Sequence, residues 1–185
     1  QQVLIEMSGS KFLALAISLK TQTGDDNLSP IIDMSRLSCH LIRNHLFNPT
    51  SGTTVDFVAD TAKRGGSGPA KYVTRPILLA NESTALDVRL SAYIPGTSEV
   101  EVFYRISNAD DSRNMHELVW TPFNTDGSPD TAIAPLDDNV SFREYQYSDS
   151  DLNKFTAFQL KLVFKGTVSS YPPRVKDLRG IALAV

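Results

Sequence analysis

The chain has 185 residues, of which 41% are hydrophobic and 21% are charged, and its formal net charge is −3. These values are typical of a folded globular domain and exclude a disordered or fibrous chain. The slightly negative charge provides no basic field for nucleic acid. The sequence also lacks a run of about 18 apolar residues, which a membrane-spanning helix would need.

The single cysteine, Cys39, excludes an internal disulfide and is compatible with assembly in a reducing cytoplasm. The sequence begins with Gln1 and Gln2 rather than methionine, so we expect a processed product or a fragment of a longer chain, and we favour the fragment. We find no internal repeat and no low-complexity tract. We therefore predict a single domain over residues 1–185.

Alternation of apolar and polar residues with a period of two is the dominant pattern, and it is typical of strands with one buried face. The segment 35–46 also fits a helix, with Leu37, Leu41 and Ile42 on one side, but its alternation favours a strand. In chain order, the strands are expected at residues 12–20, 36–42, 72–79, 85–94, 99–106, 118–120, 142–147, 158–165 and 175–185.

Two pairs of these strands are predicted to form hairpins. Residues 85–94 and 99–106 flank the turn-forming Pro95 and Gly96, and residues 158–165 and 175–185 flank a polar turn followed by a proline pair. In the second pair, alternation places Lys161 and Lys165 on the solvent side. The apolar residues expected on the buried faces are Leu86, Val88, Leu90, Ala92, Ile94, Val100, Val102, Tyr104, Ile106, Phe158, Leu160, Leu162 and Phe164. In the last strand, Val175, Ile181, Leu183 and Val185 share one parity.

Short strands at fairly regular spacing, with Gly, Pro, Asn and Asp between them, predict an all-β fold, an antiparallel β-sandwich of jelly-roll type. The segment 48–70 is the main irregular stretch, rich in small and turn-forming residues. Loops of this length in a compact domain commonly take part in function or interaction.

Motifs for catalysis or metal binding are incomplete. Ser8-Gly9-Ser10-Lys11 fits the S-x-x-K pattern of serine acyl enzymes, but the partner motifs of that chemistry do not occur. The run Asp149-Ser150-Asp151-Leu152-Asn153 begins like a calcium loop, yet Lys154 and Leu160 stand where an EF-hand needs glycine and glutamate. A looser calcium site between sandwich loops remains an alternative. We assign no catalytic, cofactor-binding or metal-binding residue.

Three aromatic residues form the candidate binding surface. Tyr93 and Phe103 lie on the strand faces opposite the aliphatic rows, and Trp120 is the last residue of the short strand predicted at 118–120. Exposed rings on a sandwich can stack on sugars or anchor a protein partner. The alternatives are that another segment of the chain covers this face and that the lone tryptophan belongs to the core.

Several collinear stretches resemble one protein family. They are Asn27–Asp33 with Arg36–Ser38, Gly65–Ser67 with Ala70–Arg75, Val100–Arg105, Phe142–Tyr145 and the closing FTAFQLKLVFKGTVSSYPPRVKDLRGIAL. Together they resemble the C-terminal β-domain of large structural proteins in the contractile tails of T4-like bacteriophages, which belong to the baseplate wedge and its attached fibres. The resemblance covers roughly residues 20 to 184.

The resemblance implies a virion structural role without catalysis or cofactor, in a baseplate assembled in the bacterial host cytoplasm. The implied partners are other baseplate or tail proteins and further copies of the chain. A carbohydrate-binding module that contacts host surface glycan is the main alternative, and a polysaccharide-cleaving enzyme is a third class. Charges of the closing strands are expected to limit edge pairing, or to meet acidic neighbours; these are Lys161, Lys165, Arg174, Lys176, Asp177 and Arg179.

Overall fold

The computed structural model describes residues 31, 46, 60–64, 66, 68–96, 98–134, 141–167 and 172–184. The chain divides into two units, residues 1–43 and 44–185, and the description below concerns the second. The strands predicted at 12–20 and 36–42, and most of the irregular segment 48–70, lie outside the described residues. The prediction of a single domain over the whole chain stays a prediction.

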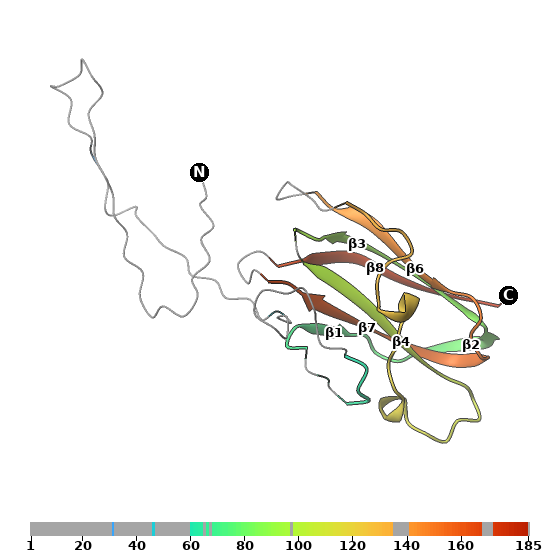
Figure 1. Ribbon diagram of the computed structural model, residues 1–185. Helices are drawn as coiled ribbons and strands as arrows, with labels where there is room; N and C mark the ends of the chain where they lie inside the picture. Colours follow the sequence, from blue (N-terminus) through green and yellow to red (C-terminus); the bar gives the residue numbers. More distant parts are fainter. Residues whose placement is uncertain are drawn as a thin grey trace, which may run out of the picture. The chain divides into compact units, whose positions relative to one another are not determined.

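The all-β sandwich is confirmed (Figure 1). Every strand pairing in the described part of the chain is antiparallel. Sheet A contains β1 (Lys71–Val73), β2 (Ile77–Ser83), β4 (Glu99–Ser107), β5 (Thr121–Pro122) and β7 (Phe155–Lys165). Sheet B contains β3 (Ala85–Tyr93), β6 (Arg143–Asp149) and β8 (Arg174–Leu183).

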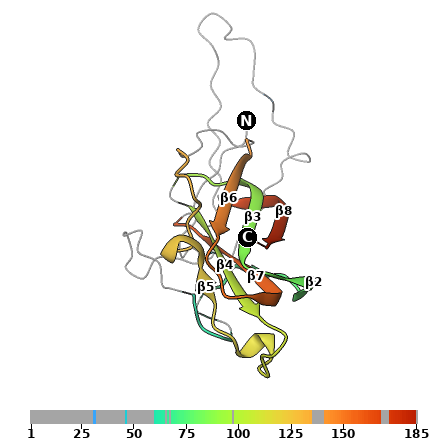
Figure 2. The same ribbon diagram turned by 90° about the vertical axis from the view of Figure 1, so that its right-hand side faces the viewer.

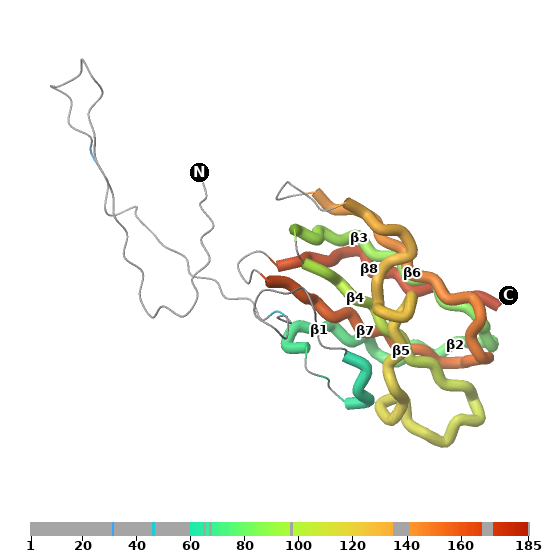
Figure 3. Tube along the Cα trace, viewed as in Figure 1, coloured from blue at the N-terminus to red at the C-terminus, as the bar shows by residue number. Residues whose placement is uncertain are grey.

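The strand order leaves β7 and β4 in the middle of sheet A and β3 in the middle of sheet B. In sheet A, β1 and β2 both pair with the same side of β7, which is followed by β4 and β5. In sheet B the order is β6-β3-β8. Figure 2 shows the two groups of strands from the side, and Figure 3 follows the chain as it passes between them.

The predicted buried faces are correct for β3, β4 and β7. In β8 the register shift puts Val175 on the inner side but leaves Ile181 and Leu183 exposed, so the common face predicted for these three residues is wrong. The alternating aliphatic residues of β3, β4 and β7 meet between the sheets, and Tyr145 and Tyr147 of β6 join them. Phe123 lies in a 3-10 turn, η3 (Phe123–Thr125), and its ring centre is 4.8 Å from that of Tyr104 and 6.1 Å from that of Tyr147. The turn therefore fills the core on the side of the sandwich formed by β5 and β6.

Both predicted hairpins are wrong. Strand β3 lies in sheet B and β4 in sheet A, and β7 and β8 are likewise in different sheets. The turn after β3, closed by a 2.9 Å hydrogen bond from the Ser98 N–H to the Pro95 carbonyl, carries the chain across the sandwich. Alternation identifies the buried face of each strand. Two neighbouring strands of one sheet and two strands that face each other across the core show the same alternation, so the pattern cannot tell which strands pair.

Two shorter predictions also change. The stretch predicted at 72–79 forms two short strands, β1 and β2, with Pro76 between them. Residues 118–120 are not a strand, and β5 begins directly after them. Proline has no N–H to donate to a ladder, which accounts for the interruption of the first stretch.

Strand β8 packs over β7 and is an edge strand of sheet B. A β-carbon placed on Gly180 would lie 3.1 Å from Leu160 Cδ1 and 3.3 Å from Phe158 Cε2, so the backbone of β8 approaches the β7 side chains closely. The register with β3 shifts between Arg89 and Ser91, opposite Asp177, which has a left-handed φ of 54°. Such a bulge twists an edge strand and restricts the registers in which another strand can pair with it.

The close approach of β8 to β7 predicts that one substitution in β8 lowers the free energy of unfolding. Gly180→Val is expected to lower the free energy of unfolding by about 1–3 kcal/mol, because the new side chain overpacks the space beside Leu160. Urea unfolding measures the change, and Ala184→Val, at an exposed position just after β8, is the control with a change of at most about 0.5 kcal/mol. Without close stacking, valine would stabilise the strand relative to glycine, and that result would contradict the arrangement.

Candidate functional site

The three aromatic residues predicted as a binding surface are buried in the structure. Tyr93, Phe103 and Trp120 are 0%, 2% and 5% exposed. Tyr93 belongs to sheet B, where its ring lies 4.6 Å from the guanidinium carbon of Arg174, and Phe103 belongs to sheet A. The three residues do not form one exposed surface, which corrects the prediction. For Phe103, the alternative in which another segment of the chain covers the face is the one observed. Trp120 belongs to a buried hydrophobic cluster with Phe103 and Val163, as the core alternative for this residue predicts.

Asp60 holds that covering segment against the outer face of sheet A. Its carboxylate Oδ1 lies 2.7 Å from Lys161 Nζ on β7, and its backbone carbonyl accepts a second hydrogen bond from the same ammonium. The other carboxylate oxygen, Oδ2, accepts hydrogen bonds from the Gly68 N–H at 2.7 Å and from Lys71 Nζ at 3.2 Å. The Lys161 and Asp60 side chains are 1% and 0% exposed, so this ion pair is removed from water.

Burial and hydrogen bonding act on the two groups in different ways. Burial alone would raise the pKa of Asp60, but the hydrogen bonds from Lys161 and Gly68 outweigh it and lower the pKa below the usual 3.8. Burial lowers the pKa of Lys161, and the hydrogen bond with Asp60 opposes that shift. The carboxylate is therefore the well-stabilised partner, whereas the ammonium depends on it as a counter-charge.

Aromatic and amide groups complete this buried cluster. Lys161 Nζ lies 4.6 Å from the ring centre of Phe103 and 4.9 Å from that of Trp120, and the guanidinium carbon of Arg105 lies 4.2 Å from the Trp120 ring centre. Arg105 donates from Nε and Nη2 to Gln159 Oε1, at 2.8 Å and 2.6 Å. Each of these cations has partners, so the cluster fits a structural role in fastening the segment that includes Asp60.

A second pair lies on the same outer face of sheet A. Lys165 Nζ donates to Glu101 Oε1, and the lysine side chain is 3% exposed. Burial raises the pKa of Glu101, and the hydrogen bond from Lys165 opposes it. Lys161 and Lys165 therefore do not act as solvent-facing charges, which corrects the sequence prediction, because β7 is a central strand with a covered outer face. The predicted charges on β8 are exposed: Arg174, Lys176, Asp177 and Arg179.

The acidic run considered for calcium has protein partners in the structure. Asp149 Oδ2 accepts a 2.8 Å hydrogen bond from the Tyr104 hydroxyl, and Oδ1 accepts a long one, 3.4 Å, from the Asp151 N–H. A search of the described residues finds no group of three or more His, Cys, Asp or Glu side chains that could hold a metal ion. Among the same residues, no helix is long and apolar enough to span a membrane.

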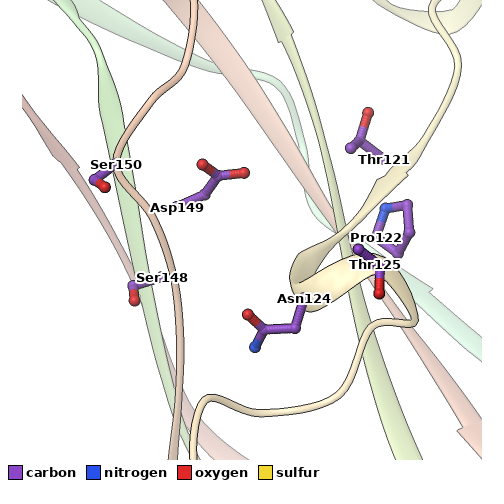
Figure 4. Close-up of a pocket in the computed structure, with 7 residues that line it drawn as sticks. All are labelled: Thr121, Pro122, Asn124, Thr125, Ser148, Asp149 and Ser150. Carbon is purple, nitrogen blue, oxygen red and sulfur yellow. The ribbon is translucent and has the colours of Figure 1, made fainter.

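A polar groove of about 630 Å³ lies between the chain around η3 and the end of β6 (Figure 4). Sequence reasoning did not predict it, because its two walls come from segments far apart in the chain. The groove offers hydroxyl, amide and carboxylate groups and contains no aromatic ring. Its lining residues are Thr121, Pro122, Asn124, Thr125, Ser148, Asp149 and Ser150.

The wall of this groove carries an unusual backbone. Asn124 and Thr125 have left-handed φ values of 49° and 68°, which is unfavourable for a β-branched residue such as threonine. The Asn124 amide donates to Asp130 Oδ1 at 2.9 Å, and Asp130 accepts a 2.6 Å hydrogen bond from the Ser148 hydroxyl. This bridge joins the two walls and fixes the shape of the groove.

Comparison with known proteins identifies no relative. No protein-family model, no curated protein and no solved structure matches the chain.

Removal of the Asp60 charge is expected to destabilise the protein strongly. Asp60→Asn leaves Lys161 buried without its counter-charge, which should lower the free energy of unfolding by about 3–5 kcal/mol. The double variant Asp60→Asn/Lys161→Met should recover part of this loss, because the unpaired ammonium is gone. Chemical denaturation at pH 7 measures each value.

An exposed ion pair provides the control for Asp60→Asn, and the lowered pKa of Asp60 predicts how the penalty depends on pH. Glu82→Gln removes the exposed Glu82–Lys154 pair and should cost at most about 1 kcal/mol. The pKa of Asp60 is lower in the folded protein than its usual value of 3.8. The stabilisation that the ionised carboxylate gives to the folded state is therefore complete above about pH 3.8, and it is lost as the pH falls through the folded pKa. The penalty of Asp60→Asn should therefore shrink in acid. A penalty at pH 7 no larger than that of Glu82→Gln would contradict a structural role for the pair.

Proposed function

We propose that the chain is a structural domain of a contractile phage tail baseplate and acts through protein–protein assembly contacts in the virion. The sequence resemblance gives the class of assembly. The observation that carries the contact role is the distribution of exposed large hydrophobic side chains: six of the eight found among the described residues lie on β1, β2 or β8. The six are Tyr72, Val73, Ile77, Leu78, Ile181 and Leu183.

Concentration of exposed apolar residues on a few edge strands favours an interface over random scatter. Tyr72 and Ile77 point to the inner side of sheet A, whereas Val73 and Leu78, opposite Lys161 and Ala157, point to its outer face, so these strands expose apolar residues on both faces. Single exposed hydrophobic residues are normal on protein surfaces. Leu78 is 81% exposed, which is costly in water unless a partner covers it. This supports the assembly role, and the proposal assigns no catalytic residue and no cofactor.

Cross-linking mass spectrometry on intact virions that contain the chain tests the proposal. Lys176 is an exposed lysine on β8 and should link to other tail or baseplate proteins, since it borders the apolar edge strands. Lys161 is buried and serves as an internal control that should not react. If Lys176 and the exposed Lys154 are modified but link to no other chain, the assembly role is contradicted.

Glycan binding is the second candidate function, and the polar groove beside η3 is the observation that favours it. Hydroxyl, amide and carboxylate groups are those that bind sugar hydroxyls, and strained non-glycine backbone clusters at ligand sites. The candidate moves from the buried aromatic residues to the groove. Its lack of an aromatic ring makes it a weaker case than the apolar edge.

A glycan array of host-surface polysaccharides tests the groove. Binding is expected to be lost in Ser150→Arg, because the long side chain would fill the groove, and retained in Asn108→Arg, at an exposed position that does not line it. Binding to no glycan, or equal binding by both variants, would remove this candidate.

A further inference from the structure

The two sheets of the sandwich do not cover each other completely. Sheet A has four strand positions across its width, with β1 and β2 sharing one, and sheet B has three strands in the described part of the chain. Gly180 places β8 over Leu160 and Phe158 of β7. On the opposite side, β6 packs beside β4 and η3: the Tyr147 hydroxyl donates a 3.1 Å hydrogen bond to the Val100 carbonyl, and its ring contacts that of Phe123. No described strand of sheet B therefore lies over β1 and β2.

Two side chains on the inner face of sheet A are exposed because no described strand of sheet B covers them. Tyr72 pairs directly with Leu162, and Ile77 pairs with Phe158, and both β7 partners face the core. Residues directly opposite in a sheet share a face, so Tyr72 and Ile77 also point to the inner side. They are nevertheless 53% and 37% exposed. Inner-face residues of a sandwich are normally covered by the other sheet.

A groove of about 340 Å³ lies over the inner face of sheet A, where no described strand of sheet B covers β1. Tyr72, Leu162 and Phe164 of sheet A line it together with residues 175–178 of β8. Strand β8 pairs with β3 on one side and has no described strand on the other. The groove thus combines an apolar floor with the backbone edge of a strand, which is the arrangement that accepts an added strand.

The length and charge of the missing strand can be estimated. The register runs from Leu162, opposite Tyr72, to Phe158, opposite Ile77, which is four residue steps or roughly 13 Å. An extended segment of about five residues would therefore cover both. The exposed charges of β8 are three cations, Arg174, Lys176 and Arg179, and one anion, Asp177. Arg179 already donates to Glu144 Oε2 at 2.7 Å, and Arg174 and Lys176 lie over the rings of Tyr93 and Phe142. Opposite charges on neighbouring strands attract, so acidic side chains suit the outward positions of the added strand.

We propose that the edge formed by β1, β2 and β8 binds an extended strand of another polypeptide, with apolar and acidic residues in alternation, which adds to sheet B beside β8 and covers Tyr72 and Ile77. This inference rests on the proposed assembly function and specifies the chemistry of the partner. The bulge at Asp177 restricts the registers in which a strand can pair, so the edge selects its partner by register as well as by charge.

Binding of synthetic peptides to the full chain tests the inference. The probe is a nine-residue peptide of alternating glutamate and valine, compared with its lysine–valine counterpart and with a version methylated at alternate backbone nitrogens. The glutamate peptide is expected to bind at least tenfold more tightly than either, because the lysines repel the β8 cations and the methyl groups block strand pairing. Tyr72→Glu should weaken binding at least tenfold, whereas Val119→Glu, at an exposed apolar residue on no edge strand, should not change it.

Several outcomes would overturn the inference. Equal binding of all three peptides, or no effect of Tyr72→Glu, would mean that no strand docks at this edge. Slow hydrogen exchange in the free monomer at the β8 amides that do not bond to β3 would show that the chain covers the edge itself. A dimer of the free chain that Tyr72→Glu dissociates would make a second copy the occupant. These results leave the proposed assembly function standing, because that function fails only if the virion lysines link to no other chain.

Discussion

Burial of β7 on both faces is the constraint on which the rest of the sandwich depends. Its inner face supplies Phe158, Leu160 and Leu162 to the core between the sheets. Its outer face carries Lys161 and Lys165, which are almost fully buried. A buried ammonium requires a counter-charge, so the chain must bring carboxylates to this face. The position of the segment that includes Asp60 follows from that requirement rather than from its own secondary structure.

The sequence predicted the longer strands β3, β4 and β7 and their inner faces well, because alternation has a direct physical cause in the pleat of a strand. It did not predict strand partners. The Pro95-Gly96 turn is compatible with a hairpin, yet it connects β3 to β4 in the other sheet. Nothing in a local pattern distinguishes the roughly 5 Å step to a neighbouring strand from the roughly 10 Å step across the core. Pairing depends on contacts distant in the sequence.

The covered outer face left one signal in the sequence that was available before the structure. Phe103 on β4 and Val163 on β7 share the parity of the polar residues, and both are apolar and buried. A strand that exposes one face to water has little reason to place large apolar residues there. The polar groove gave no comparable signal, because residues 121–125 and 148–150 meet only through the packing of η3 against β6.

The two lateral sides of the sandwich differ in how they are closed, and this difference bears on the proposed assembly role. On one side, Phe123 of η3 fills the space beside Tyr104 and Tyr147, so the core there is complete. On the other, Tyr72 and Ile77 point to the inner side and remain partly exposed. Since one side is filled by the chain's own turn, incomplete cover is not a general property of this fold. Among the described residues it is found at the edge formed by β1, β2 and β8, where no further described strand pairs with β8 and apolar side chains are exposed. An added strand would gain both hydrogen bonds and burial there.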